Sequence, residues 1–300
     1  MYSDQKLNAY STGGVIPDIE LVEYPSQLEE LQSLLKTIPC RLIACSGGID
    51  SLLLATVAHR QSPQTTTVAH AISPAVPEEA TARVRFWAEK EGWNLVVVQS
   101  GEFQSEEYLS NPVNRCYYCK SNLYHALSQL SSHVEEGYVM MSGANQDDLG
   151  EYRPGLIAAS ENCVRHPYVE TEISKQGIRD IAHALKLPFA DLPASPCLAS
   201  RLYTGTRVTP ERLRAVEVGE ALIRRETGIQ VVRCRVKEDA MYVEVGAEDR
   251  PHITPSLLAQ VKFAAKQHIN ALCNVQLDAK AYSPGRAFVQ TIDAAAAADH

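Results

Sequence analysis

One short segment combines the residue types that phosphate binding requires. Residues 46–51, here named the glycine loop, read Ser-Gly-Gly-Ile-Asp-Ser and directly follow an apolar run at 41–45. Paired glycines let the backbone approach phosphate oxygens, and a helix that starts here presents its first amides and positive dipole end to an anion. The two serines add hydroxyl donors, and Asp50 fits beside phosphate when Mg²⁺ lies between them. The segment predicts a phosphate-binding turn; an ordinary strand-to-helix turn is the alternative.

Cysteine spacing indicates a second kind of chemistry. Cys116 and Cys119 lie three residues apart, so at a helix start they can place two thiolates on one metal or cluster, and the helix end favours the thiolate form. A redox dithiol and half of a zinc site are alternatives. The first residues lack the basic-then-apolar order of a secretion signal, so we expect a reducing, cytoplasmic setting. Five other cysteines are predicted to be buried small hydrophobes: Cys40, Cys45, Cys163, Cys234 and Cys273.

Two arginines form a third candidate group. Arg233 and Arg235 alternate with apolar residues in a predicted strand over 230–236, so both point from one face, roughly 7 Å apart. Paired guanidinium groups suit a phosphate monoester. Two solvated arginines on an open sheet face are the alternative.

Alternating strands and helices must position these groups. Strands are predicted at 41–45, 66–72, 95–98, 138–142 and 166–169. Helices are predicted between them at 51–59, 77–91, 117–131, 154–161 and 173–187. This order predicts an α/β fold with a parallel sheet covered on both faces. Ligands of such sheets bind at the carboxyl ends of the strands, where the strand order switches.

The pattern changes near residue 200. Thr209 and Pro210 predict a helix start that runs to Gly228, and a second capped helix begins at Thr254. Strands are predicted at 230–236, 241–245 and 275–277. We therefore expect a second, smaller α+β domain with a largely antiparallel sheet. The predicted division is 20–203 and 204–290, with tails at 1–19 and 291–300.

Charge and hydropathy exclude several classes of protein. The 300 residues carry 28 Lys and Arg against 36 Asp and Glu, which gives 28 − 36 = −8 and disfavours nucleic acid as a partner. With 45% hydrophobic and 21% charged residues the composition is that of a globular protein. No apolar run approaches the roughly 18 residues that span a bilayer, so no membrane association is expected.

Several strings resemble one known family. The glycine loop resembles the pyrophosphate loop of the PP-loop ATP pyrophosphatases, which have an adenine nucleotide alpha hydrolase-like fold. Residues 114–120, 143–148, 151–155 and 196–201 resemble the LarE sulfur transferases, in that order and at comparable spacing across 31–277. The resemblance implies adenylation, with ATP and Mg²⁺, of a carboxylate of pyridinium-3,5-biscarboxylic acid mononucleotide. A sulfur nucleophile then gives the thiocarboxylate needed for the nickel-pincer cofactor of lactate racemase.

The same resemblance implies roles for individual residues. Cys197 stands where single-cysteine LarE proteins give up their own sulfur, whereas the set Cys116, Cys119 and Cys197 is similar to the subfamily that holds a [4Fe–4S] cluster. Both sulfur sources stay open. The implied ATP and pyrophosphate site comprises Ser46, Gly47, Gly48, Asp50 and Ser51. The implied substrate site comprises Arg233, Arg235, Glu244 and Tyr118.

Other polar residues in the matching strings have open roles. Asp147 and Asp148 could bind Mg²⁺ or cap a helix, and surface salt bridges are an alternative for three more: Glu151, Arg153 and Arg201. Two rival functions remain, a tRNA-thiolating enzyme of the same superfamily and a non-catalytic nucleotide-binding iron–sulfur module. LarE relatives form hexamers, so the resemblance also implies a homo-oligomer.

Overall fold

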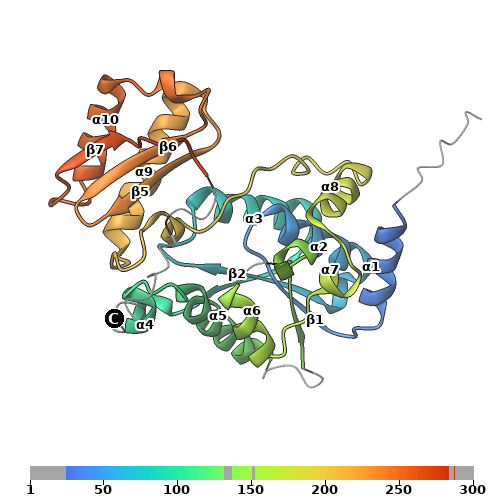
Figure 1. Cartoon of the computed structure of the whole chain (residues 1–300). Helices are drawn as coiled ribbons and strands as arrows, with labels where there is room; N and C mark the ends of the chain where they lie inside the picture. Colours follow the sequence, from blue (N-terminus) through green and yellow to red (C-terminus); the bar gives the residue numbers. More distant parts are fainter. Residues whose placement is uncertain (1–24, 132–136, 151–152, 284–286, 288–300) are drawn as a thin grey trace, which may run out of the picture.

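A four-stranded parallel sheet forms the centre of the first part of the chain (Figure 1). The computed structural model describes residues 25–131, 137–150, 153–283 and 287; the predicted tails at 1–19 and 291–300 and Glu151 lie outside them. The strands are β1 (Arg41–Ala44), β2 (Thr66–Ile72), β3 (Asn94–Gln99) and β4 (Val139–Ser142). Their order is β3-β2-β1-β4, so the order switches between β1 and β4. The α/β prediction is confirmed for this part.

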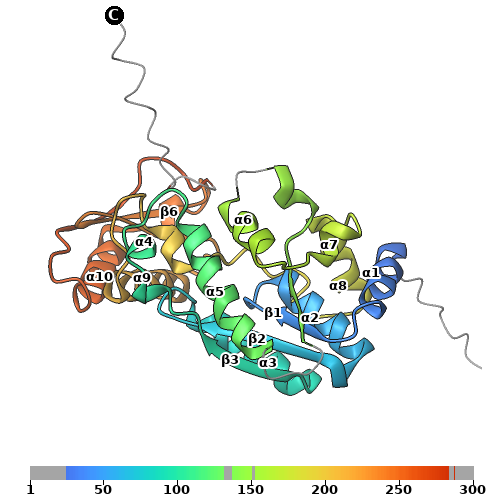
Figure 2. The same cartoon turned by 90° about the horizontal axis from the view of Figure 1, so that it is seen from below.

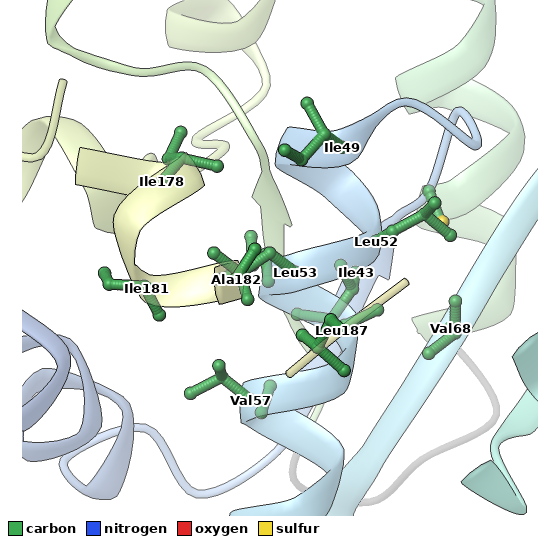
Figure 3. Packing of buried hydrophobic residues seen from close by; sticks show 14 of the residues in the cluster. Ile43, Ile49, Leu52, Leu53, Val57, Val68, Ile178, Ile181, Ala182 and Leu187 are labelled. Atoms are coloured by element: carbon green, nitrogen blue, oxygen red, sulfur yellow. The ribbon is translucent and has the colours of Figure 1, made fainter. Parts of the chain in front are cut away.

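Helices cover both faces of this sheet. One face packs against α1 (Ser26–Lys36), α2 (Ile49–Gln61), α3 (Glu78–Glu91) and α8 (Lys175–Ala184). The other packs against α5 (Arg115–Ser131) and α6 (Pro154–Glu161), seen beside each other in Figure 2. Neighbouring residues of β1 point to opposite faces of the sheet. Ile43 is buried in the apolar cluster on the side of α2 and α8, and Leu42 is buried in the cluster on the side of α5 and α6. Figure 3 shows Ile43 among α2 and α8 side chains such as Leu53 and Ala182.

The predicted strand at 166–169 is wrong. Residues Pro167–Glu170 form the short helix α7, and only Arg165 makes a β-bridge, to Met141. Proline fixes φ near the helical value and lacks an amide proton, so Pro167 starts a helical turn and cannot donate to a ladder.

The last part of the chain forms a three-stranded sheet with two helices. Its elements are α9 (Pro210–Thr227), β5 (Val232–Lys237), β6 (Ala240–Val245), α10 (Pro255–Lys266) and β7 (Asn274–Leu277). The predicted caps are confirmed: the Thr209 hydroxyl accepts from the Arg212 amide, and Gly228 ends α9 at φ +76°. β5 and β6 pair antiparallel as predicted, but β7 pairs parallel to β6 because α10 carries the chain back before β7 begins.

The two parts share apolar packing. Tyr108, Leu198 and Ala199 belong to the same buried cluster as the core of α9 and β5, although they precede residue 204. The division at 203/204 therefore stays a prediction. Figure 1 shows the C-terminal elements at the end of the molecule away from α1. The remaining short elements are α4 (Glu106–Leu109) and 3₁₀ turns at Pro63–Thr65, Glu102–Gln104, Gln146–Gly150, Leu198–Arg201 and Arg250–His252.

Within the described ranges, no helix is both long and apolar enough to cross a membrane.

Candidate active site

The glycine loop lies at the carboxyl edge of the sheet, between the end of β1 and the start of α2. Gly47 has φ +83°, and a Cβ there would lie 2.8 Å from the Ala80 carbonyl oxygen of α3, so only glycine fits. Gly48 takes the N-cap position, which leaves the first amides of α2 at the loop. The predicted strand, turn and helix start are therefore all present.

The two serines of the loop bind each other and the backbone. Their hydroxyl oxygens lie 3.2 Å apart, and the Ser51 hydroxyl accepts from the Ser46 amide at 3.1 Å. The Ser51 hydroxyl also lies 3.1 Å from the Gly48 carbonyl oxygen, to which it can donate. The loop is thus held in shape by its own side chains, and ligand binding by these hydroxyls would replace contacts within the loop.

Asp50 has a carboxylate oxygen that is available to a cation. Its Oδ1 is buried and, among the residues that the structure describes, has no hydrogen-bond partner. Burial raises the pKa of this carboxyl, while the positive charge of Lys175 opposes the shift. Gly143, just after β4, packs directly on the Asp50 backbone, where a Cβ would clash. A buried oxygen without a donor fits the oxygen preference of Mg²⁺.

The residues after β4 build the other side of this edge. Asp147 accepts a hydrogen bond from the Lys175 amide at 2.6 Å, at the start of α8. Asp148 accepts from the Asn145 amide at 3.1 Å and pairs with Arg153 at 3.0 Å. The capping alternative therefore describes Asp147 better than a metal-binding role, and the salt-bridge alternative describes Arg153.

The structure brings the three predicted cysteines into one neighbourhood. Cys116 and Cys119 lie in the first turns of α5, and the negative charge of Cys197 helps to raise the pKa of both thiols. Burial is the larger cause and raises the pKa of Cys119 to about 12. Positive charge at Arg115 opposes the shift at Cys116, but burial outweighs it. Burial thus outweighs the effect of the helix start, which favours the thiolate form.

Two contacts hold Cys197 at this place. The segment that carries it, residues 194–201, donates the Leu198 amide to the Ala75 carbonyl oxygen, just beyond the end of β2, at 2.8 Å. Arg115 donates to the Ala199 carbonyl oxygen at 3.0 Å. Because β1 and β2 are parallel neighbours, the Cys197 segment and the glycine loop lie at the same edge of the sheet.

The cysteine region contains further polar groups. Tyr108 is buried at 1% exposure, and its hydroxyl has no hydrogen-bond partner in the described part of the chain. Burial raises the pKa of this tyrosine far above its usual value, and Cys197 is the next cause. The Lys120 ammonium lies 5.9 Å from the Tyr124 ring and is also affected by all three thiols. Tyr118 packs on the shared apolar cluster, edge-on to Tyr117.

Three thiols in one neighbourhood are the ligand type that an iron–sulfur cluster requires. No three His, Cys, Asp or Glu side chains within the described ranges are arranged to hold one ion. A [4Fe–4S] cluster binds each thiolate on a different iron, so its ligands stand further apart. Arg115 and Lys120 supply positive charge beside the three thiols. An anionic cluster that binds thiolate sulfur is compatible with three thiols next to two positive side chains.

The remaining cysteines differ from one another. Cys45 and Cys234 are buried as predicted, and Cys40 is half-buried. The prediction is wrong for Cys163 and Cys273, which are exposed.

The two arginines of β5 share a face, but that face is covered. Arg233 and Arg235 are 6% and 4% exposed, so the solvated alternative is wrong. Arg235 donates to Glu244 at 2.7 Å and to the Ser200 carbonyl oxygen at 3.0 Å. Arg233 donates to the Ala194 and Val232 carbonyl oxygens. The Cys197 segment therefore lies against both predicted substrate-binding arginines, and Glu244 already neutralises one of them.

Arg201 is part of the interior and not a surface residue. It forms a buried ion pair with Glu220 of α9 at 2.9 Å and donates to the Pro196 and Cys197 carbonyl oxygens at 2.7 and 3.1 Å. The Glu220 carboxylate also accepts from the Cys234 amide. Arg201 thus joins Cys197 to α9 and β5. In the sequence, Arg201 was only a charged residue in the string at 196–201, which cannot be distinguished from a surface arginine.

A cavity of about 350 Å³ lies between the two parts of the chain. Its walls come from the first turns of α3, from residues 192–198, and from α9 and the start of β5. The charged lining residues are Glu78, Glu79, Arg83, Arg201, Arg214, Glu217, Glu220, Arg224 and Arg233. Sequence reasoning identified Arg233 but missed Arg83, because an arginine inside an amphipathic helix carries no motif.

The fold and this edge define an α/β protein of the kind that binds ligands at the carboxyl ends of parallel strands. No protein-family model matches the chain. It is 36% identical over 261 residues to the uncharacterized protein slr1717 of Synechocystis, covering 87% of this chain and 96% of that protein. It is 32% identical over 187 residues to the uncharacterized protein MJ0830 of Methanocaldococcus jannaschii, covering 61% and 69%.

The chain therefore belongs to the family of slr1717 and MJ0830. It is also a distant homologue of the pyridinium-3,5-bisthiocarboxylic acid mononucleotide synthase of Lactiplantibacillus plantarum, with 28% identity over 72% of this chain and 78% of that protein. This relative supports the resemblance to LarE proteins that the sequence strings indicated.

Proposed function

We propose that the protein is an ATP-dependent sulfur transferase of the LarE type. Its substrate would be pyridinium-3,5-biscarboxylic acid mononucleotide, and its product the thiocarboxylate that becomes the nickel-pincer cofactor of lactate racemase. The distant synthase of Lactiplantibacillus plantarum supports this class. The observation that carries the proposal is the hydrogen bond from the Leu198 amide to the Ala75 carbonyl oxygen, which holds Cys197 at the sheet edge of the glycine loop.

The first proposed step is adenylation. A substrate carboxylate oxygen attacks the α-phosphorus of ATP, the bond to the β-phosphate oxygen breaks, and pyrophosphate leaves with that electron pair. Amides of Gly47, Gly48 and the first turn of α2 would hold the departing phosphates, with Ser46 and Ser51. Asp50 would bind Mg²⁺ through its buried oxygen, which has no protein donor within the described residues.

The second proposed step replaces oxygen with sulfur. A sulfur nucleophile attacks the activated acyl carbon, and AMP leaves. Cys116, Cys119 and Cys197 would hold a [4Fe–4S] cluster that supplies a sulfide, or Cys197 would give up its own sulfur and become dehydroalanine. Arg233 would bind the substrate phosphate, with Arg235 and Glu244 completing that face and Tyr118 stacking beside the substrate.

Pyrophosphate release tests the adenylation step. With ATP and Mg²⁺, the purified protein should release pyrophosphate only when the pyridinium dicarboxylate mononucleotide is present. Mass spectrometry should then find one oxygen exchanged for sulfur in that substrate. ATP binding without substrate-dependent release would instead favour a non-catalytic nucleotide-binding module.

Iron content and protein mass separate the two sulfur sources. Anaerobically purified protein should carry about four irons per chain and absorb broadly in the visible range if the cluster is present. Loss of about 34 Da at Cys197 after turnover would indicate that this residue is sacrificed.

Binding to tRNA tests the rival thiolating enzyme. The net charge of −8 disfavours it, and filter binding at low salt, where backbone contacts are strongest, should show no retention. We also propose that the protein is cytoplasmic, because all eight cysteines are free. We propose a homo-oligomer, because LarE relatives are hexamers. Light scattering would test the oligomer.

A further inference from the structure

Arg83 connects the glycine loop to the charged cavity. It lies in the second turn of α3, and its Nη1 donates to the Gly47 carbonyl oxygen at 2.6 Å. The same side chain lines the cavity of about 350 Å³ that Arg233 lines from β5. α3 also packs closely on the loop, since a Cβ at Gly47 would lie 2.8 Å from the Ala80 carbonyl oxygen. Arg83 is thus fixed between the predicted phosphate site and the predicted substrate site.

The other charges of the cavity neutralise one another. Arg201 pairs with Glu220, and Arg214 pairs with Glu78 and Glu217. Arg224 lies within ion-pair distance of Glu79 and Glu220. All four lining carboxylates therefore have arginine partners.

Arg83 and Arg233 differ from these three arginines. Within the described part of the chain, their hydrogen bonds go to backbone carbonyl oxygens, and neither forms an ion pair. Arg233 also lies 5.3 Å from the Tyr282 ring. An arginine keeps its charge even when partly buried. The cavity thus offers two guanidinium groups to anionic groups of a ligand, one on the α3 wall and one on the β5 wall.

The two positions match the two ends of a pyridinium mononucleotide. Such a molecule carries a phosphate on its ribose and carboxylates on its ring, so its anionic groups lie at opposite ends. Arg233 stands among residues of the C-terminal part, whereas Arg83 touches the loop that would hold the phosphates of ATP. The carboxylate must meet the α-phosphorus next to that loop, so the ring end belongs at Arg83. The planar guanidinium fork suits a carboxylate.

We propose that Arg83 binds the substrate carboxylate that is adenylated and orients it toward ATP on the glycine loop. The assignment rests on the proposed function. Arg83 contacts one carboxylate oxygen while the other attacks the α-phosphorus and pyrophosphate leaves; no proton moves. Arg83 thereby selects substrates with an ionised carboxyl at this position.

Binding measurements with two ligands test the assignment. The pyridinium dicarboxylate mononucleotide and nicotinamide mononucleotide both carry a ribose phosphate, but the second has a neutral carboxamide. The wild-type protein should prefer the dicarboxylate. Arg83→Gln should weaken dicarboxylate binding by roughly 10- to 100-fold, the range of a charged hydrogen bond, and abolish that preference. Arg233→Gln should weaken both ligands by a similar factor and keep the preference.

Two matched variants exclude indirect effects. Arg85→Gln changes an exposed arginine of the same helix and should bind both ligands as the wild type does. Arg83→Lys keeps a donor for the Gly47 carbonyl but lacks the planar fork, so its preference should be intermediate. ATP affinity, measured alone, should be unchanged in Arg83→Gln.

Distinct outcomes identify which proposal fails. A preference retained in Arg83→Gln, or an equal loss of ATP and substrate binding, would show that Arg83 only supports the loop and would overturn the assignment. Wild-type protein that binds neither mononucleotide would instead overturn the proposed function itself, and the assignment with it.

Discussion

The cavity and the cysteine region differ in whether their buried polar groups have partners within the protein. In the cavity, all four carboxylates have arginine partners, and Arg83 and Arg233 donate to backbone oxygens. Beside the cysteines, burial raises the pKa of Cys116 and Cys119, and the Tyr108 hydroxyl has no partner among the described residues. Within the described residues, the carboxylates of the cavity are therefore neutralised by the protein itself, whereas the charges of Arg83 and Arg233 are left for an anionic ligand. In the cysteine region the Tyr108 hydroxyl would gain a hydrogen bond from a group bound there.

The largest expected effect is loss of sulfur transfer on replacing Cys197 with serine. A hydroxyl neither donates sulfur nor replaces a thiolate ligand of iron, so thiocarboxylate formation should fall below detection. Adenylation should persist, because the cavity and the glycine loop do not need this thiol. Product mass spectrometry and pyrophosphate assays measure the two steps. Cys273→Ser, at an exposed cysteine, is the control; transfer by Cys197→Ser would remove both sulfur routes from consideration.

Next in size is the stability loss expected for Glu220→Gln. The variant leaves the Arg201 guanidinium buried without its counter-charge, which costs about 3–5 kcal/mol in comparable buried pairs. Urea unfolding measures this change in free energy. Glu226→Gln, at an exposed pair with Arg225, should remain close to the wild type. A small effect of Glu220→Gln would mean that the cavity is less dependent on its ion pairs than we conclude.

Asp50→Asn should affect ligand binding and stability in opposite directions. Removing the proposed Mg²⁺ ligand should weaken Mg²⁺–ATP binding by at least roughly tenfold. Stability of the free protein should rise at neutral pH. Because burial raises the pKa of this carboxyl in the folded protein above its ordinary value, the carboxyl contributes stability at low pH that is lost as the pH rises through the folded pKa.

Thermal unfolding measured between acidic and neutral pH tests this sign. Wild type and Asp50→Asn should be equally stable in acid, and the variant should become the more stable as pH rises. The opposite trend would mean that the Asp50 carboxylate already has a stabilising partner.

The smallest effect is expected for Tyr108→Phe. Removing a buried hydroxyl without a partner should stabilise the free protein by about 1 kcal/mol. Tyr168→Phe is the matched control, because that hydroxyl donates to the Asp50 carbonyl oxygen at 2.9 Å and its loss should destabilise. Destabilisation by both variants would mean that Tyr108 has a partner without any bound group. Urea unfolding compares the two.

Local signals in the sequence predicted most of the α/β sheet. Apolar runs bounded by Gly and Pro gave β1 and β2, and the caps at Thr209 and Gly228 located α9, because these patterns act within a few residues. The strand expected at 166–169 failed where a proline overrode an apolar pattern. The largely antiparallel sheet that was predicted did not include the parallel pairing of β7 with β6, because that pairing depends on where α10 returns the chain.

The candidate site was predictable in its motifs but not in its surroundings. Residue spacing indicated the glycine loop and the cysteine pair. It could not predict that residues 194–201 cover Arg233 and Arg235, nor that burial would raise the thiol pKa values. Both depend on packing between residues more than 30 positions apart. Arg83 was missed for the same reason, since its partner Gly47 lies 36 residues away.

The bond between the Leu198 amide and the Ala75 carbonyl has a consequence for solvent exchange. This proton can exchange with deuterium only when residues 194–201 detach from the edge of β2, so its uptake rate measures how often Cys197 leaves its place. A nucleotide settling across that edge would slow the exchange at Leu198 even though it need not touch the residue.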